Sequence, residues 1–392
     1  MHRSAQVLGL ILCAGLTVGA QPFGQRAPLT PAETLLAPAV LSAIDEQPLT
    51  AESTPETAGT DPNAGSILLT CREDECAAAS RAARKLSALV ASKAIPPPAR
   101  SIRVAWAIDE SMKTGVKAAI HVAELADRPL QVVRAPWSTA SIGDEVVEVL
   151  IRRNGYVAEV RPFEDLGQLR LDPHGIPTTT IVMNAWASRD HAAATAAAAA
   201  YFLATLPNDG AEALLSHLMV GAHARLAEDG RRAVAQMGPT QRAGADVLIL
   251  MGQAIDREHR RIRSLARFMP APLDATLASR MADMEKGVAS VWTSLGITSS
   301  PFVPPVERIR GRGGDDRRVP ARVPGATGTA DSAVLKHANH ADVGYEIVNF
   351  IDGKRTISDI RDAVMAEVGQ VGLPAVVQYL EALAKAGSLT IK

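Results

Sequence analysis

The fold is decided by four short apolar runs, SILLT (66–70), SIRVAWAI (101–108), PLQVVRAPW (129–137) and TTTIVMN (178–184). These runs are rich in β-branched residues, and segments of helical pattern separate them at residues 75–92, 115–125 and 142–153. The alternation predicts βαβ units, and therefore an α/β fold with an open, mainly parallel sheet and helices on both faces. Functional residues are then expected at the carboxyl ends of the strands.

The length of the chain limits the number of domains it can contain, and its charge limits the kinds of partner it can attract. At 392 residues it is long enough for two or three domains. Lys and Arg number 41 against 42 for Asp and Glu, so the net charge of −1 gives no basis for attracting nucleic acid. Only 4% of the residues are aromatic, which disfavours base-stacking surfaces as well.

The first twenty residues have the pattern of an export signal. Arg3 precedes an apolar run over residues 7–18, and Val18-Gly19-Ala20 offers a cleavage point. The run is too short to span a bilayer comfortably. We therefore predict a cleaved signal peptide and export to the periplasm or the exterior, without stable membrane insertion. A short buried helix or a membrane anchor is the alternative interpretation of the same run.

Two cysteines, Cys71 and Cys76, follow the signal segment. Export permits a disulfide, and their separation across a strand-to-helix turn is compatible with one. Two unpaired thiols packed near the strand end fit the sequence equally well. Two cysteines without a second pair or a nearby histidine do not make a zinc site.

Shifts in composition divide the rest of the chain. Residues 21–65 are an N-terminal segment with one helical candidate at 32–44, followed by a polar linker. An α/β core (66–206), a helical region packed on it (207–299) and a Pro-, Arg- and Gly-rich linker (300–332) come next. The clearest helical stripe steps by three or four residues through Leu273, Leu277, Met281, Met284, Val288, Trp292 and Leu295.

Residues 333–392 have the pattern of a compact winged-helix module. Thr356 to Asp359 is a capping box that opens one helix, and Pro374 begins the next. Gly387 ends that helix, and residues 388–391 form a closing strand in this interpretation. A module of this size buries little surface by itself, so we expect it to dock on another surface.

The motifs of the α/β core resemble the secreted di-zinc aminopeptidases, specifically bacterial members with a C-terminal extension. Their metal-site half is similar to residues 68–110, LLTCREDECAAASRAARKLSALVASKAIPPPARSIRVAWAIDE, and further matches are VVRAPWS (132–138) and DPHGIPTTTIVMNAW (172–186). The tail YEIVNFIDGKRTISDIRDAV (345–364) is similar to the extension of these peptidases and to PqqD-type peptide-binding winged helices. The resemblance implies an aminopeptidase-like sheet, hydrolysis of N-terminal residues, and zinc as the cofactor.

The same resemblance assigns roles to four residues and meets one conflict. Glu110 takes the position of the catalytic acid, and Asp74, Asp109 and His191 are the nearest matches to metal ligands. Arg72 stands where the strand should lead to a His ligand, and a permanent cation there would repel zinc. Two zinc ions need about five His and carboxylate ligands and a carboxylate base, and this chain departs from that pattern at nearly every ligand. Asp109 and Glu110 also fit a solvated loop or a helix cap, and His191 fits a surface position.

Three functions remain open. The favoured one is an exported aminopeptidase-like protein whose zinc site has decayed, so that it binds a peptide or a protein partner and no cofactor is expected. The second is an active zinc aminopeptidase with a rearranged site, which requires Asp74, Asp109, Glu110 and His191 to converge. The third is a DNA-binding regulator acting through the winged helix, and both export and the near-neutral tail argue against it.

Overall fold

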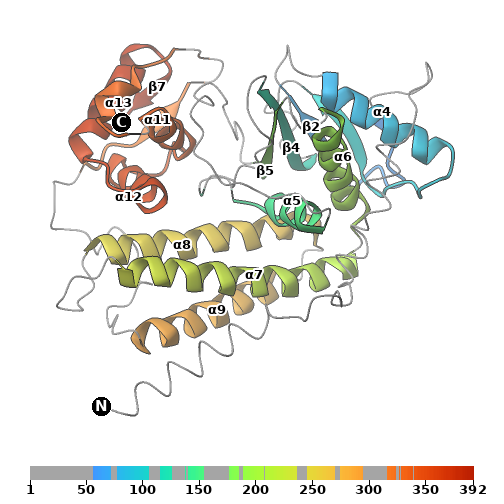
Figure 1. Ribbon diagram of the computed structural model, residues 1–392, viewed down its shortest axis with the longest axis horizontal. Coiled ribbons are helices and arrows are strands. Elements are labelled where there is room, and N and C mark those ends of the chain that lie inside the picture. The colour runs from blue at the N-terminus through green and yellow to red at the C-terminus, as the bar shows by residue number, and fades with distance from the viewer. Residues whose placement is uncertain are drawn as a thin grey trace.

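The computed structural model describes residues 56–71, 77–105, 115–125, 137, 140–153, 176–184, 189–206, 208–235, 245–269, 274–294, 316–323, 326, 328–338 and 340–392. Within these residues the chain is a mixed α/β protein. A five-stranded sheet, a layer of long helices and a C-terminal module make up the molecule (Figure 1). The predicted signal segment, the helical candidate at 32–44 and the apolar run at 129–136 lie outside the described residues.

The sheet has the strand order β1-β3-β2-β4-β5. β2 (Ser66–Thr70) pairs in parallel with β3 (Ser101–Ala105) on one side and with β4 (Val116–Leu125) on the other. β5 (Thr178–Asn184) extends the parallel set beyond β4, and β1 (Glu56–Thr57) pairs antiparallel with β3. The sheet is therefore mixed but mainly parallel, and β2 and β5 have the bounds that the apolar runs predict.

β4 corrects one expectation, because the helix predicted at 115–125 is wrong. Its residues Val116, Ala118, Ala119, Ile120 and Val122 are all buried, on both faces of the strand. A strand enclosed between two neighbours and covered on both faces carries a continuous apolar run rather than an alternating one. Periodicity alone cannot distinguish such a run from a short buried helix.

Three helices cover one face of the sheet. α6 (Arg189–Thr205) lies between α4 (Ala77–Ala91) and α5 (Ile142–Arg153), and α5 has the predicted bounds. Ile67 and Leu69 of β2 share a core with these helices, whereas Leu68 belongs to a separate buried cluster on the opposite face. Helices on both faces were predicted; α4, α5 and α6 all pack on this one.

A layer of long helices follows the sheet, as the periodicity of residues 207–299 predicts. It consists of α7 (Asn208–Ala235), α8 (Ala245–Ser264) with a 3-10 turn, η3 (Leu265–Phe268), and α9 (Asp274–Ser294). The predicted stripe is buried in α9 at Leu277, Met281, Met284, Val288 and Trp292. Among the described helices none is by itself long and apolar enough to cross a membrane, although one bent pair in the C-terminal module meets the criteria jointly.

The C-terminal module combines three helices with a two-stranded sheet. In chain order it contains β6 (Pro320–Arg322), η5 (Ser332–Leu335), α11 (His340–Asn349), α12 (Ile357–Val368), α13 (Leu373–Lys385) and β7 (Leu389–Ile391). The capping box at Thr356 and Asp359 is present, as predicted. β6 pairs with β7 although it falls in the predicted linker, so the module begins earlier in the chain than 333. It docks through α12 on α8 (Figure 1).

Candidate functional site: a buried acid–arginine network

The residues that the aminopeptidase resemblance singles out are only partly described. His191 lies in the first turn of α6, and Asp74, Asp109, Glu110 and Arg72 lie outside the described residues. Within the described part of the chain, no group of three or more His, Cys, Asp or Glu side chains is placed to hold a metal ion. Because Asp74, Asp109 and Glu110 are not among the described residues, the convergence of these three acids with His191 stays a prediction.

The described residues at the carboxyl end of β2 provide few candidate ligands for a metal ion. Thr70, its last residue, lies in register with His121 of β4, and the Thr70 hydroxyl and His121 Nδ1 are 3.1 Å apart. Cys71 follows and is disulfide-bonded to a partner outside the described residues, which settles for Cys71 the alternative between a disulfide and a free thiol. Because metals bind the thiolate form of cysteine, the sulfur of Cys71 is not a ligand in this state.

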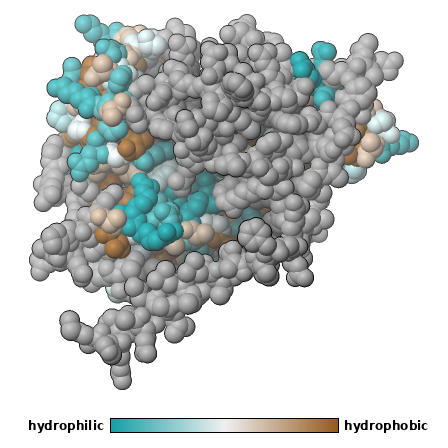
Figure 2. Space-filling model, in the orientation of Figure 1, coloured by the Kyte–Doolittle hydropathy of each residue, from teal (hydrophilic) through white to brown (hydrophobic). Residues whose placement is uncertain are grey.

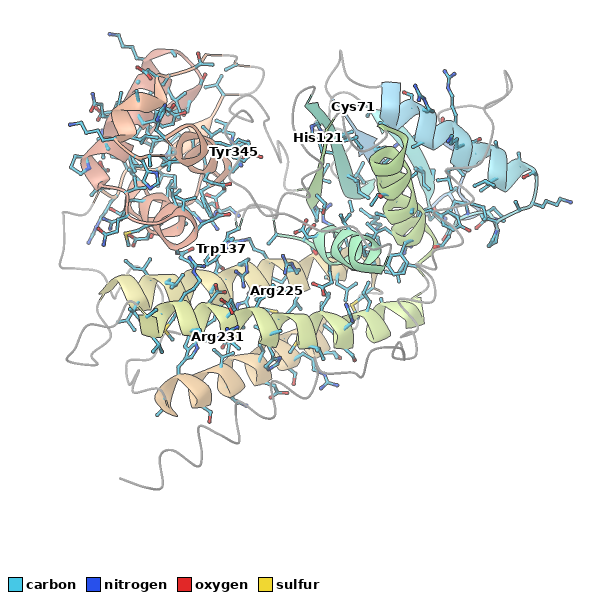
Figure 3. All side chains as sticks on the ribbon, in the orientation of Figure 1. Cys71, His121, Trp137, Arg225, Arg231 and Tyr345 are labelled. Atoms are coloured by element: carbon cyan, nitrogen blue, oxygen red, sulfur yellow. The ribbon has the colours of Figure 1, made fainter. Side chains whose placement is uncertain are left out.

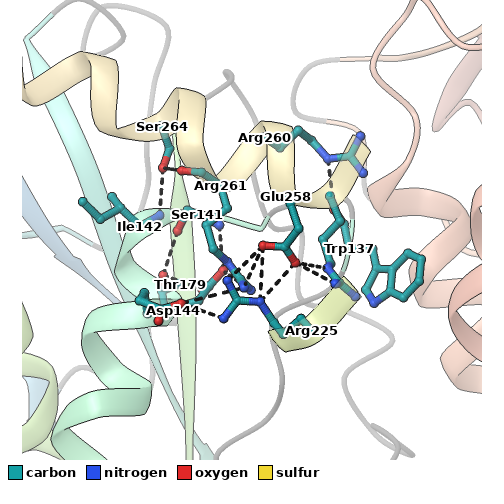
Figure 4. A network of polar contacts seen from close by, with 12 residues as sticks. Trp137, Ser141, Ile142, Asp144, Thr179, Arg225, Glu258, Arg260, Arg261 and Ser264 are labelled. Atoms are coloured by element: carbon teal, nitrogen blue, oxygen red, sulfur yellow. Dashed lines mark hydrogen bonds and ion pairs between the residues drawn. The ribbon is translucent and has the colours of Figure 1, made fainter. Parts of the chain in front are cut away.

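Among the described residues, a cluster of buried charge lies elsewhere, where α5, α7 and α8 meet. We call it the acid–arginine network, and it consists of Asp144 and Glu145 of α5, Arg225 and Asp229 of α7, and Arg257, Glu258 and Arg261 of α8. Figure 4 labels Asp144, Arg225, Glu258 and Arg261 of this set. The helices approach closely there: a Cβ atom on Gly221 of α7 would lie 2.8 Å from Glu145 Oε1. A larger residue at that position would require the Glu145 carboxylate to shift.

Glu258 is the centre of the network and is fully buried. Arg225 donates to both of its oxygens, with Nη2 2.9 Å from Oε2, and Arg257 Nε donates to Oε1 at 2.7 Å. Arg261 Nη1 lies 3.6 Å from Oε2. Burial by itself would raise the pKa of Glu258, but the three guanidinium groups outweigh it and lower the pKa to about 2. Glu258 therefore stays ionised at any physiological pH.

Glu145 connects the network to α5. Its Oε2 accepts from Arg225 Nη1 at 2.8 Å, and its Oε1 lies 3.2 Å from His217 Nε2. Burial raises the pKa of Glu145, but His217, Arg225 and Arg261 together lower it below its usual value. One guanidinium, that of Arg225, thus bridges Glu145 and Glu258, which belong to different helices.

Asp144 behaves differently from its neighbour. It accepts hydrogen bonds from the Ser141 backbone N–H and from the Thr179 hydroxyl of β5, both at 2.7 Å. The nearest guanidinium, that of Arg261, is 3.8 Å away. Burial raises the pKa of Asp144 to about 6, and Arg261 and the two hydrogen bonds offset only part of that effect. The pKa of Asp144 thus moves in the opposite direction to those of Glu145 and Glu258.

Trp137 closes the network on the side of the C-terminal module, where Figure 3 shows it between the module and α8. The Arg257 guanidinium carbon lies 4.5 Å from the centroid of its ring. Its backbone N–H donates to Glu367 of α12, at 3.1 Å to Oε1, and its carbonyl accepts from Arg260 Nε at 3.0 Å. Trp137 is therefore held by both α8 and the module.

The joint between the module and α8 has a polar rim. Figure 2 shows hydrophilic side chains gathered where the two meet. Arg232 of α7 donates to the carbonyl of Ala366 in α12 at 3.2 Å, and Arg355, which precedes α12, lies 3.7 Å from Asp256 of α8. Both α7 and α8 thus contribute polar contacts to the docked module.

The arrangement favours electrostatic locking over acid–base chemistry. A general base works best when its pKa lies near the operating pH, and Glu258 and Glu145 have pKa values moved away from that range. Asp144 has a suitable pKa, but its residue neighbours Ser141, Glu145 and Thr179 are all buried. The network is a means of holding α5, α7 and α8 in one arrangement.

No protein-family model and no curated protein sequence matches this chain. The aminopeptidase resemblance therefore depends on the quoted motifs alone.

Proposed function

We propose that this chain is a binding protein built on an aminopeptidase-like scaffold, with a decayed zinc site and a peptide or protein as its ligand. The observation that carries the proposal is Arg72, a permanent cation at the position where the resemblance requires a zinc ligand. The described neighbours of that position support it, since Cys71 is committed to a disulfide and Thr70 to His121.

Zinc content and peptidase activity of the purified full-length chain test the first half of the proposal. We expect no stoichiometric zinc after dialysis against zinc-containing buffer, and no release of nitroaniline from aminoacyl-nitroanilides. Glu110→Ala is the matched control, because activity that persists in this variant comes from a contaminating enzyme. Bound zinc together with turnover that Glu110→Ala abolishes would overturn the proposal.

Binding of short peptides tests the second half. A scaffold derived from an aminopeptidase should retain a preference for a free N-terminal amine, because exopeptidases of this kind recognise the chain end. We expect a mixture of peptides with free N-termini to be retained on the immobilised chain more strongly than the same mixture after N-acetylation. Equal retention of the two mixtures would contradict this part of the proposal.

The second candidate is a working zinc aminopeptidase with a rearranged site. One observation favours it: His191 lies in the first turn of α6, a few residues after the carboxyl end of β5, which is the edge where ligands of a parallel sheet bind. This candidate predicts that His191→Ala removes both zinc and turnover. The zinc and nitroanilide measurements therefore separate the two functions directly.

A further inference from the structure

A continuous path of polar contacts runs from the sheet to the C-terminal module. It begins at Thr179 of β5, whose hydroxyl donates to Asp144 at 2.7 Å. Arg261 lies 3.8 Å from Asp144 and 4.0 Å from Glu145, the next residue of α5, and so links the two acids. Glu145 accepts from Arg225, and Arg225 also binds Glu258. Every group on this part of the path is at least four-fifths buried, so water contributes little to holding it together.

The second half of the path crosses α8 and enters the module. Arg257, the residue before Glu258, binds Glu258 Oε1 and Asp229 Oδ2, the latter at 2.9 Å. Its guanidinium lies over the ring of Trp137, and the backbone N–H of Trp137 donates to both oxygens of Glu367 at 3.1 and 3.2 Å. Glu367 is the module's contribution to the path.

Trp137 belongs to the α/β core by sequence, because it lies between the end of β4 and the start of α5. In space it is clamped by groups from α8 and α12, and its side chain is 2% exposed. Loss of the Glu367 carboxylate would leave the Trp137 N–H without this acceptor. Movement of Trp137 would in turn uncover Arg257, which is paired with two buried acids.

We infer that the C-terminal module is a regulatory clamp: its docking on α8 is coupled, through Trp137 as the positioning residue, to the packing of α5 on the sheet. Buried polar networks support such coupling because removing one member leaves the others desolvated and unpaired, so that effects along the network are not additive. A partner that takes the module off α8 therefore loosens the joint between α5 and β5. The coupling is independent of whether the chain hydrolyses peptides.

Hydrogen–deuterium exchange of the full-length chain tests the clamp. In Glu367→Ala we expect exchange in α12 to rise roughly tenfold, the effect of losing one charge-assisted hydrogen bond. Exchange in α5 and β5, at the other end of the path, should rise in the same direction by a smaller factor. Glu367→Gln keeps an oxygen acceptor and should recover part of both effects, and it serves as the test variant if Glu367→Ala does not fold.

Glu381→Ala is the matched control. Glu381 lies on α13 and its Oε1 is 2.8 Å from Arg318 Nη1, with both side chains exposed and within the module. This variant should leave exchange in α5 and β5 unchanged. An increase in α5 of the same size as in Glu367→Ala would mean that any damage to the module loosens the body, which would overturn the specific path.

A double-mutant cycle gives the second readout. Thr179→Val removes the donor at the sheet end of the path, and Glu367→Ala the acceptor at the module end. Coupling predicts that their effects on the denaturation midpoint are non-additive, while Thr179→Val and Glu381→Ala simply add. If the effects add in both cycles, or if exchange becomes faster in α12 alone, the docking of the module is not coupled to the packing of α5 and the inference is wrong.

Discussion

α6 and α8 are both largely buried helices, and they differ in that α8 buries charged side chains beside apolar ones such as Leu250 and Ile262. Residues 195–204 of α6 are nearly all Ala, Tyr, Phe and Leu, and none of the alanines at 196–200 is more than 4% exposed. α8 buries Arg257, Glu258 and Arg261 at 1, 0 and 4% exposure. α6 lies against the sheet through apolar contact, whereas α8 is joined to α5, α7 and the module by charged contacts.

The two interfaces respond differently to change. Apolar burial is non-directional and roughly proportional to area, so the α6 interface loses stability in small steps. Buried ions carry a large desolvation cost that is offset only while every partner is present. The α8 interface is therefore less tolerant of change than the α6 interface, and it specifies one arrangement of α5, α7 and α8. Variants of the two interfaces test that contrast, beginning with the largest expected effect.

Removing the central acid of the network should be the most damaging single change. Glu258→Ala leaves Arg225, Arg257 and Arg261 facing one another without their shared carboxylate. Breaking a buried pair in this way costs about 3–5 kcal/mol. Urea unfolding of the purified chain measures the loss, provided that the variant is compared at constant pH and salt.

The control for Glu258 is an exposed acid of the same helical layer. Glu228 pairs with Arg231 on α7, and their side chains are 50% and 76% exposed. Glu228→Ala should change the free energy of unfolding by less than about 1 kcal/mol, because water screens exposed ion pairs. Equal losses from the two variants would show that burial does not decide the strength of these contacts.

The second prediction concerns Asp144 and the pH dependence of stability. Because burial raises its pKa to about 6 from 3.8, the folded chain retains a proton that the unfolded chain releases. The stability that this proton contributes is complete below about pH 4 and is lost as the pH rises to about 6. The full change is roughly 3 kcal/mol, because a tenfold difference in proton affinity corresponds to about 1.4 kcal/mol.

Asp144→Asn isolates this contribution, since an amide does not titrate. The parent chain loses stability between about pH 4 and 6 and the variant does not, so the difference between them should shift in favour of the variant across that window and stay level outside it. Glu258 acts in the opposite sense and at lower pH: its pKa of about 2 lies below the ordinary value of 4.5, so its contribution is complete above pH 4.5 and is lost on acidification. A difference that does not vary between about pH 4 and 6 would contradict the assignment to Asp144.

Much of the fold follows from local pattern. The runs at 66–70 and 178–184, the helix at 142–153 and the capping box at Thr356 are present as the sequence predicts. Each depends on residues close together in the chain, such as β-branched runs between turn residues. β4 and β6 depart from the prediction. β4 is enclosed by β2 and β5, and β6 is a strand through its pairing with β7, and periodicity within either segment does not record these partners.

The acid–arginine network was missed because its partners are distant in sequence. Arg225 and Glu145 are 80 residues apart, and Arg225 and Glu258 are 33 apart. The segment DREHRR (256–261) has the composition of a solvated helix face. A signal was present, however: Ala254, Glu258, Arg261 and Leu265 step by four, three and four, so an acid and a base lie on one stripe between apolar residues. The four aminopeptidase positions remain predictions from resemblance alone.

The smallest effect on stability is expected from a substitution in the apolar interface of α6. Ala199 of α6 is fully buried, and α6 packs on β2, β4 and α4. Ala199→Leu keeps good helix propensity, so its cost comes from overpacking and should be about 1–3 kcal/mol. Urea unfolding measures it against Ala227→Leu, an exposed alanine of α7 whose change should stay within about 0.5 kcal/mol. If Ala199→Leu does not lower the free energy of unfolding while Glu258→Ala unfolds the chain, the two interfaces differ in tolerance by more than packing density alone predicts. If Ala199→Leu is the more damaging of the two, the charged interface is the more tolerant one, and the clamp would need another basis.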